Sequence, residues 1–165
     1  MSKDETLLDL AKRNMDIANL LYSHKESDDG FLNHVGYHLQ QCVELAVKHF
    51  LETHGIEYSF THDIDELLDQ VPTEYQVLFD PISDLAGTIT NMEAKTRYIK
   101  NYRLSERIVS RVLPLANQLL QNIGEVDKKE RLSNEAEANA EAVTGQVSPP
   151  TAEEEGNGEI SWNEG

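Results

Sequence analysis

The chain of 165 residues contains a single cysteine, Cys42, so no disulfide can form within it. Long apolar runs are also missing. Residues 1–20 have no continuous apolar core, which argues against a secretory signal peptide, and no stretch is long enough to span a bilayer. These absences favour a cytoplasmic protein without a membrane anchor.

Basic residues are scarce. The chain has 14 Lys and Arg against 30 Asp and Glu, and its formal net charge is −16. Residues 1–126 carry a net charge of −9 and residues 127–165 a net charge of −7, so both parts are acidic. Such a charge argues against a general nucleic-acid coat protein and against a protein that binds anionic membranes.

No stretch alternates apolar and polar residues for long enough to predict a sheet. Apolar residues instead recur at steps of three and four, as they do on one face of an amphipathic helix. The sequence therefore predicts an all-α fold, an up-and-down helical bundle of four main helices plus one short helix. The predicted helical segments are 5–23, 31–54, 63–71, a broken helix over 73–93, and 104–124, where Pro114 predicts a kink or restart near 110–114.

The composition changes after the last predicted helix, which Gly124 is expected to close. Residues 133–165 are rich in Ala, Glu, Gly and Pro and have almost no large apolar side chains. Such a segment cannot bury enough surface to offset the entropy lost on ordering. We therefore predict a helical domain over 1–126 and an acidic, disordered tail over 127–165.

The helix predicted over 31–54 has an apolar face, which includes Cys42, and a polar side. On the polar side, Gln40, Glu44 and Lys48 are spaced four residues apart and form one row. Gly55 is expected to end this helix, because glycine readily takes the left-handed conformation of a helix C-terminus. Thr61 is expected to cap the next helix, with Asp63 in its first turn.

A cluster of basic residues is the only local positive field on this acidic chain. Helical spacing would place Lys100, Arg103, Arg107 and Arg111 on one face. Two tyrosines would be available for base stacking, and this arrangement favours contacts with phosphates or RNA. The alternatives are a solvated face that pairs with the domain's own carboxylates, or one that docks a partner chain or the acidic tail. The cluster comprises Lys95, Arg97, Lys100, Arg103, Arg107 and Arg111, with Tyr98 and Tyr102 interleaved.

The order and spacing of several motifs resemble the HEPN domain family. These motifs are Tyr37-His38, Gln40-Gln41, Glu44, Lys48, Gly55, Thr61-His62-Asp63 and Arg97-Tyr98. The resemblance covers roughly residues 5–124. It implies a helical bundle that pairs as a homodimer. It also implies a cleft where Gln40, Glu44, Lys48, His62 and Asp63 converge with Arg97 and Tyr98. The structural alternative is that Glu44 neutralises Lys48 or Arg97, while Thr61 and Asp63 only cap a helix.

One motif that the resemblance leads us to expect is missing. Many catalytically active HEPN nucleases carry an Arg followed four to six residues later by a His, and no such pair occurs here. A metal site is not indicated either, because His34 and His38 supply only two ligands. No glycine-rich phosphate loop or nucleophile motif is recognisable, and we expect no cofactor.

The favoured hypothesis is therefore a non-catalytic HEPN-like binding module for a nucleotide, RNA or a partner protein. A degenerate ribonuclease that uses Arg97, His62 and Glu44 is the enzymatic alternative. A further alternative is a partner of a nucleotidyltransferase in a toxin–antitoxin pair.

Overall fold

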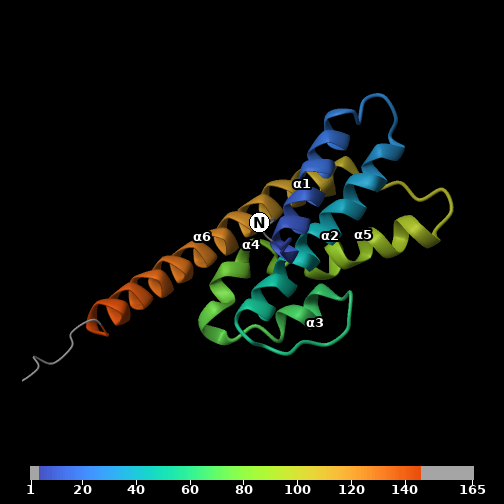
Figure 1. Cartoon of the computed structure of the whole chain (residues 1–165). Coiled ribbons are helices and arrows are strands. Elements are labelled where there is room, and N and C mark those ends of the chain that lie inside the picture. Colours follow the sequence, from blue (N-terminus) through green and yellow to red (C-terminus); the bar gives the residue numbers. More distant parts are fainter. Residues whose placement is uncertain (1–3, 146–165) are drawn as a thin grey trace, which may run out of the picture. The chain divides into compact units, whose positions relative to one another are not determined.

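The computed structural model describes residues 4–145 and contains only helices and connecting segments over that range (Figure 1). The predicted all-α bundle is confirmed. Four long helices and several short ones make up the fold. The long helices are α1 (Leu7–Ser23), α2 (Gly30–Thr53), α5 (Ala86–Tyr98) and α6 (Glu106–Thr144), and the short ones are α3 (Ile64–Leu68), the 3₁₀ helix η1 (Thr73–Phe79) and α4 (Asp80–Ser83).

α2 is the central helix of the fold and contacts α1, α3 and α5. Val35, Leu39 and Phe50 on its apolar face are fully buried. Figure 1 shows α1 and α2 side by side and antiparallel, joined by the turn at residues 24–29. Side chains from α6, among them Val112 and Leu119, belong to the same core. Burial of this apolar surface is the main force that holds the helices together.

Gly55 ends α2 as predicted. Its φ of 65° is left-handed, a conformation that costs glycine little because it has no Cβ. The amide of Ile56 donates to the carbonyl of Leu51 at 2.9 Å, and the amide of Gly55 donates to the carbonyl of Glu52 at 3.1 Å. These two bonds form a Schellman motif, which satisfies carbonyls at the end of the helix.

The helix predicted over residues 73–93 is broken, as expected, into η1, α4 and α5. Pro81 lies in the first turn of α4, where its missing N–H is not needed. α5 continues beyond the predicted end and reaches Tyr98. Residues 99–105 are not helical, and Asn101 adopts a left-handed φ of 61° there. This segment connects α5 to α6.

α6 is longer than predicted and is continuous through Pro114 and past Gly124 to Thr144. The expected restart near 110–114 and the end at Gly124 were therefore wrong. The chain divides into two units, residues 1–128 and 129–165. Residues 127–144 are helical rather than lacking structure, which fits their Ala, Glu, Lys and Arg content, since these residues have high helix propensity. The rest of the predicted tail, 146–165, lies outside the described residues.

Deleting residues 130–165 is expected to leave the thermal midpoint of the remaining domain within about 2 °C of the full chain. The reason is that residues 131–145 are exposed and add nothing to the core. Thermal unfolding followed by circular dichroism at 222 nm measures this. A decrease of several degrees would show that the deleted residues stabilise the domain.

Cys42 lies on the buried face of α2 and is fully inaccessible. Burial, with a smaller effect from Asp16, raises the pKa of its thiol to about 12. The reactive thiolate is therefore scarce at neutral pH. We expect a thiol reagent to label the native protein very slowly and the protein in denaturant at once. Because Cys42 is the only cysteine, the signal is unambiguous. Rapid labelling of the native protein would contradict the packing of α2.

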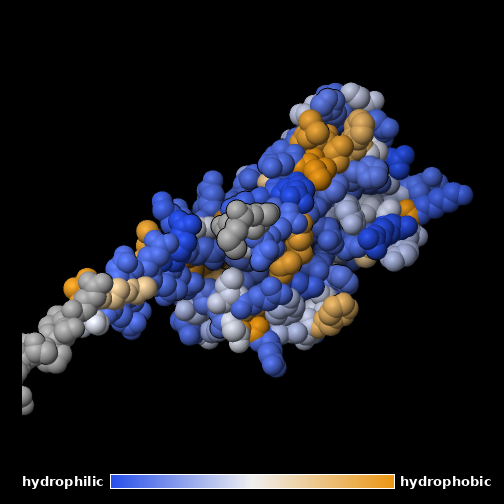
Figure 2. All heavy atoms as spheres, in the orientation of Figure 1, coloured by the Kyte–Doolittle hydropathy of each residue, from blue (hydrophilic) through white to orange (hydrophobic). Residues whose placement is uncertain are grey.

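The face of the molecule in Figure 2 is mostly hydrophilic, with an apolar patch over the end of α1, where Leu20 is 61% exposed.

Within residues 4–145, no helix is long and apolar enough to cross a membrane.

Candidate binding site

The polar row of α2 is buried rather than exposed to solvent. Gln40 is fully inaccessible and Glu44 is 3% exposed. The side-chain nitrogen Nε2 of Gln40 donates to the backbone carbonyl of His62 at 3.4 Å, so the segment that precedes α3 lies over this part of α2. The row is therefore a polar contact between the buried side of α2 and the Thr61-His62-Asp63 turn, in which the His62 side chain stays 70% exposed.

Glu44 is the centre of this contact. Its carboxylate accepts hydrogen bonds from Lys48 Nζ at 2.8 Å and from Gln40 Nε2 at 2.8 Å. It also accepts one from His62 Nδ1 at 3.0 Å, and since a carboxylate can only accept, that ring nitrogen carries the proton. Burial alone would raise the pKa of Glu44, but the hydrogen bonds from Lys48, Gln40 and His62 and the charge of Lys48 lower it overall. Glu44 is therefore held as a carboxylate.

A chain of polar side chains links this contact to α5. Gln41 Nε2 donates to Gln40 Oε1 at 2.7 Å and to Glu93 Oε2 at 3.5 Å. Glu93 in turn forms an ion pair with Arg97 at 3.1 Å. In residues 4–145, Arg97 contacts neither His62 nor Glu44 directly. The structure thus brings His62 and Glu44 together but connects Arg97 to them only through other side chains.

Asp63, rather than Thr61, is the cap of α3. Its carboxylate accepts from the amides of Asp65 at 2.9 Å and Glu66 at 3.4 Å. The hydroxyl of Thr61 accepts from the amide of Asp63 at 3.1 Å and so supports the turn instead. The predicted capping residue was wrong by two positions. Asp63 is engaged in local structure, as the structural alternative proposed.

The basic residues do not share one helical face, so this prediction was wrong. Lys100 and Arg103 lie in the connecting segment 99–105, whereas Arg107 and Arg111 lie on α6. Asn33 of α2 fixes the segment, because its side chain donates to the carbonyl of Tyr102 at 2.8 Å and accepts from the amide of Leu104 at 2.8 Å. No feature of the sequence marked Asn33 for this role.

Arg97 and Arg103 meet at one hollow of about 470 Å³, which we call the arginine–tyrosine hollow. The Arg97 guanidinium carbon lies 5.4 Å from the centre of the Tyr37 ring. Hydrogen bonds with Tyr37 and Tyr98, and then the charge of Glu93, raise the pKa of Arg97. Arg103 Nε contacts Asp29 at 3.2 Å. The hollow is lined by Gly30, Asn33, His34, Tyr37, Thr96, Arg97 and Arg103.

The sequence model of the HEPN domain matches residues 5–126, about three quarters of the chain. The chain belongs to the HEPN domain family. No curated protein and no solved structure matches it. The motifs that carried the resemblance thus lie within a true HEPN domain, and it has no Arg–His motif of the spacing described above.

Two other predicted residues of this HEPN domain lie outside the hollow. Tyr98 is 80% exposed at the end of α5, so its ring is open to a ligand. Tyr102 packs partly against the core, and the hollow is not lined by it. His34, whose spacing from His38 indicated no metal site, does line the hollow. Its position could be found only once α2, α5 and the connecting segment were placed in space.

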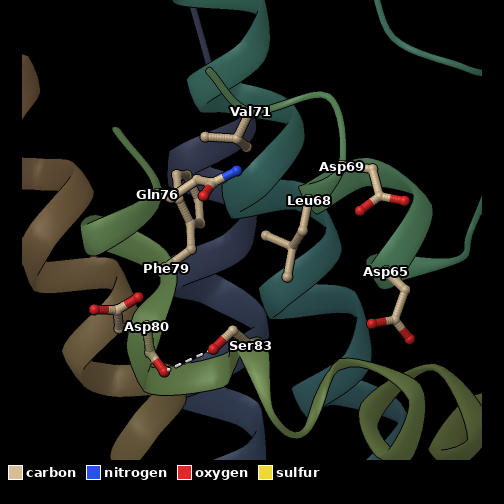
Figure 3. Close-up of a pocket in the computed structure, with 8 residues that line it drawn as sticks. All are labelled: Asp65, Leu68, Asp69, Val71, Gln76, Phe79, Asp80 and Ser83. Carbon is tan, nitrogen blue, oxygen red and sulfur yellow. Dashed lines mark hydrogen bonds between the residues drawn. The ribbon is translucent and has the colours of Figure 1, made fainter. Parts of the chain in front are cut away.

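A second hollow of this HEPN domain, about 350 Å³ in volume, has acidic walls (Figure 3). Asp65 and Asp69 extend from α3 and the 3₁₀–α4 region contributes Asp80 and Ser83. Burial, followed by the charges of Asp63 and Asp69, raises the pKa of Asp65. A phosphate would be repelled there. Over the part of the chain that the structure describes, no three His, Cys, Asp or Glu side chains are placed to hold a metal ion.

Proposed function

We propose that this HEPN domain is a non-catalytic binding module that takes a phosphate-bearing ligand, a nucleotide or RNA, in the arginine–tyrosine hollow. The observation that supports this most is the gathering of Arg97, Arg103 and Tyr37 around one hollow on an otherwise acidic chain. Arginine pairs well with phosphate oxygens, and a tyrosine ring provides a face for a base.

The contacts of the other predicted residues favour binding over catalysis. Glu44 is saturated by three donors, and Asp63 caps α3. Arg97, which would stabilise a reacting phosphate in a degenerate ribonuclease, does not meet His62. We therefore expect no metal-independent cleavage of single-stranded RNA. Cleavage that disappears in His62→Ala would support the enzymatic alternative instead.

The test of ligand binding uses fluorescence anisotropy with a fluorescein-labelled single-stranded oligoribonucleotide, and calorimetry with ATP. The double variant Arg97→Gln/Arg103→Gln is expected to bind at least about tenfold more weakly at low salt. The slope of log K against log salt should also become shallower by about 0.7 for each phosphate that the variant no longer neutralises. Equal binding by the variant and the wild type would contradict the proposal.

A matched control is available in Arg13→Gln/Arg131→Gln. Both arginines are exposed and each pairs with a carboxylate, Arg13 with Glu5 and Arg131 with Glu135, so the change in charge and in ion pairs is the same. This control should bind as the wild type does. If it weakens binding equally, the effect is one of net charge rather than of the hollow.

Tyr37 separates contacts with a base from contacts with phosphate alone. Tyr37→Phe keeps the ring, whereas Tyr37→Leu removes it. If a base stacks on the ring, Tyr37→Leu should weaken oligoribonucleotide binding by about 1–3 kcal/mol and Tyr37→Phe by much less. Small and equal effects of the two substitutions on oligoribonucleotide binding would show that the ligand contacts the hollow through phosphate alone.

The same proposal extends to the oligomeric state, the location and the partner of the domain. We propose that the domain pairs as a homodimer in the cytoplasm, as the family resemblance implied, with a nucleotidyltransferase as an alternative partner. Light scattering on the purified full chain tests the first, since a monomer mass at micromolar concentration would contradict pairing. A nucleotidyltransferase encoded by a neighbouring gene would support the alternative.

A further inference from the structure

A third hollow lies between the start of α5 and the first turns of α6. It has a volume of about 390 Å³, and we call it the arginine-rimmed groove. Leu85 and Thr88 line it from the α5 side, and Ser105, Arg107, Ile108 and Arg111 line it from the α6 side. These residues are separate from those of the arginine–tyrosine hollow.

The two arginines of the groove are free to meet a ligand. Arg107 and Arg111 are exposed and lie one helical turn apart, so they project from the same side of α6. Across residues 4–145, neither guanidinium forms a hydrogen bond or an ion pair. Arg97 and Arg103, by contrast, are both paired with carboxylates. The groove therefore presents two arginines whose hydrogen-bond donors are available.

The remaining walls of the groove show what kind of ligand fits between these arginines. Leu85, Ile108 and Val112 give it an apolar surface, and Thr88 and Ser105 add hydroxyl groups. No aromatic side chain lines it, so it offers no ring on which a base could stack. An apolar surface flanked by arginines is characteristic of the buried centre of protein–protein interfaces.

We propose that the arginine-rimmed groove binds an acidic peptide segment of a partner protein. Two carboxylates of the segment pair with Arg107 and Arg111 in the bidentate geometry that guanidinium favours. An apolar or aromatic side chain between those carboxylates packs on Leu85 and Ile108. The chain as a whole has a net charge of −16 and repels an acidic segment, so electrostatics direct the segment to this groove.

The experiment uses the full chain and a fluorescein-labelled peptide of five glutamates, one leucine and one tryptophan, with anisotropy as the measurement. Arg107→Glu/Arg111→Glu is expected to weaken binding by about tenfold or more. The control Lys128→Glu/Lys129→Glu reverses the same number of charges at two positions of the same helix and should bind nearly as the wild type does. Circular dichroism of each variant confirms that it is folded.

Two further variants test the chemistry of the groove. Arg107→Lys/Arg111→Lys keeps the charge but loses the bidentate geometry, and should weaken peptide binding by a smaller factor than the charge reversal. Ile108→Asn removes the apolar contact. It should weaken binding of the peptide that carries leucine and tryptophan, but not of a peptide in which both are replaced by alanine.

Equal binding of the peptide by the wild type and by Arg107→Glu/Arg111→Glu would overturn the proposal. So would an oligoribonucleotide that binds the wild type, loses affinity in this variant and excludes the peptide, because the groove would then be a phosphate site. The hollow and the groove are tested with separate variants, so either one can fail alone.

Discussion

Replacing Glu44 with alanine is expected to lower the free energy of unfolding by about 3 kcal/mol, which corresponds to a decrease in Tm of about 10 °C. Removing the carboxylate leaves Lys48, whose side chain is only 12% exposed, without its partner. It also leaves the amide nitrogen of Gln40 and the Nδ1 proton of His62 without the acceptor they share. Urea unfolding followed by circular dichroism measures the loss.

The control for this prediction is Glu57→Gln, which changes an exposed glutamate of the loop before α3 and should alter stability by less than about 0.5 kcal/mol. A second comparison is Glu44→Met/Lys48→Met. Because an apolar pair carries no desolvation cost, this double variant should be more stable than Glu44→Ala. A loss for Glu44→Ala below about 1 kcal/mol would show that Lys48 and His62 find other partners.

The contribution of Glu44 also depends on pH. Its pKa in the folded protein is lowered from the ordinary value of 4.5, so the folded state binds fewer protons at this group than the unfolded state does. The stabilisation is therefore complete above about pH 4.5 and is lost as the pH falls through the folded pKa. The stability difference between the wild type and Glu44→Gln should shrink as the pH falls below the ordinary pKa of the carboxyl group, 4.5.

Gly36→Val is expected to lower the free energy of unfolding by about 2–3 kcal/mol, again measured by urea unfolding. A Cβ at this position of α2 would overlap a methyl group of Leu104 and lie 3.4 Å from Cβ of Met92. Leu104 is 3% exposed and Met92 is 1% exposed, so neither can move into solvent. The side chain of Leu104 must therefore change its position inside the packed core.

Gly124→Ala provides the control, because a Cβ at Gly124 of α6 meets no atom within 4 Å. This substitution should raise stability by about 0.5–1 kcal/mol through the backbone entropy of glycine. Combining Gly36→Ala with Leu104→Ala tests the cause directly. The paired loss should be smaller than the sum of the single losses, since Leu104→Ala removes the overlap with the new Cβ, and that Cβ fills part of the space that Leu104→Ala leaves. Additive losses of stability would show that the overlap with Leu104 is not the cause of the destabilisation.

The sequence was sufficient to predict the helices of the core, because Val35, Leu39 and Phe50 follow the helical period without exception. It was sufficient for the end of α2 as well, since Gly55 is a local signal. It could not show that Gln40 and Glu44 are buried. Their burial depends on the turn that lies over them, and polar residues four apart on a helix are usually exposed.

The site was harder to predict for the same reason. Lys100 to Arg111 has the spacing of one helical face, but Asn33, distant in the sequence, holds the intervening backbone in a non-helical form. That contact separates the basic residues into a hollow and a groove. The length of α6 was underestimated because Gly124 was taken as the end of the helix, whereas one glycine costs only about 1 kcal/mol inside a helix of good helix formers.

The Asn33 contact has a consequence for the motions of the connecting segment. The amide of Leu104 lies outside any helix, yet it donates to a side chain anchored in α2. Its hydrogen exchange with solvent should therefore be slow, at a rate similar to that of amides inside α2 and far slower than that of Lys100. Asn33→Ala should bring the exchange of Leu104 to the rate of an exposed loop. The amide of Leu104 can thus report, at a single position, how often the segment between the hollow and the groove detaches from the core.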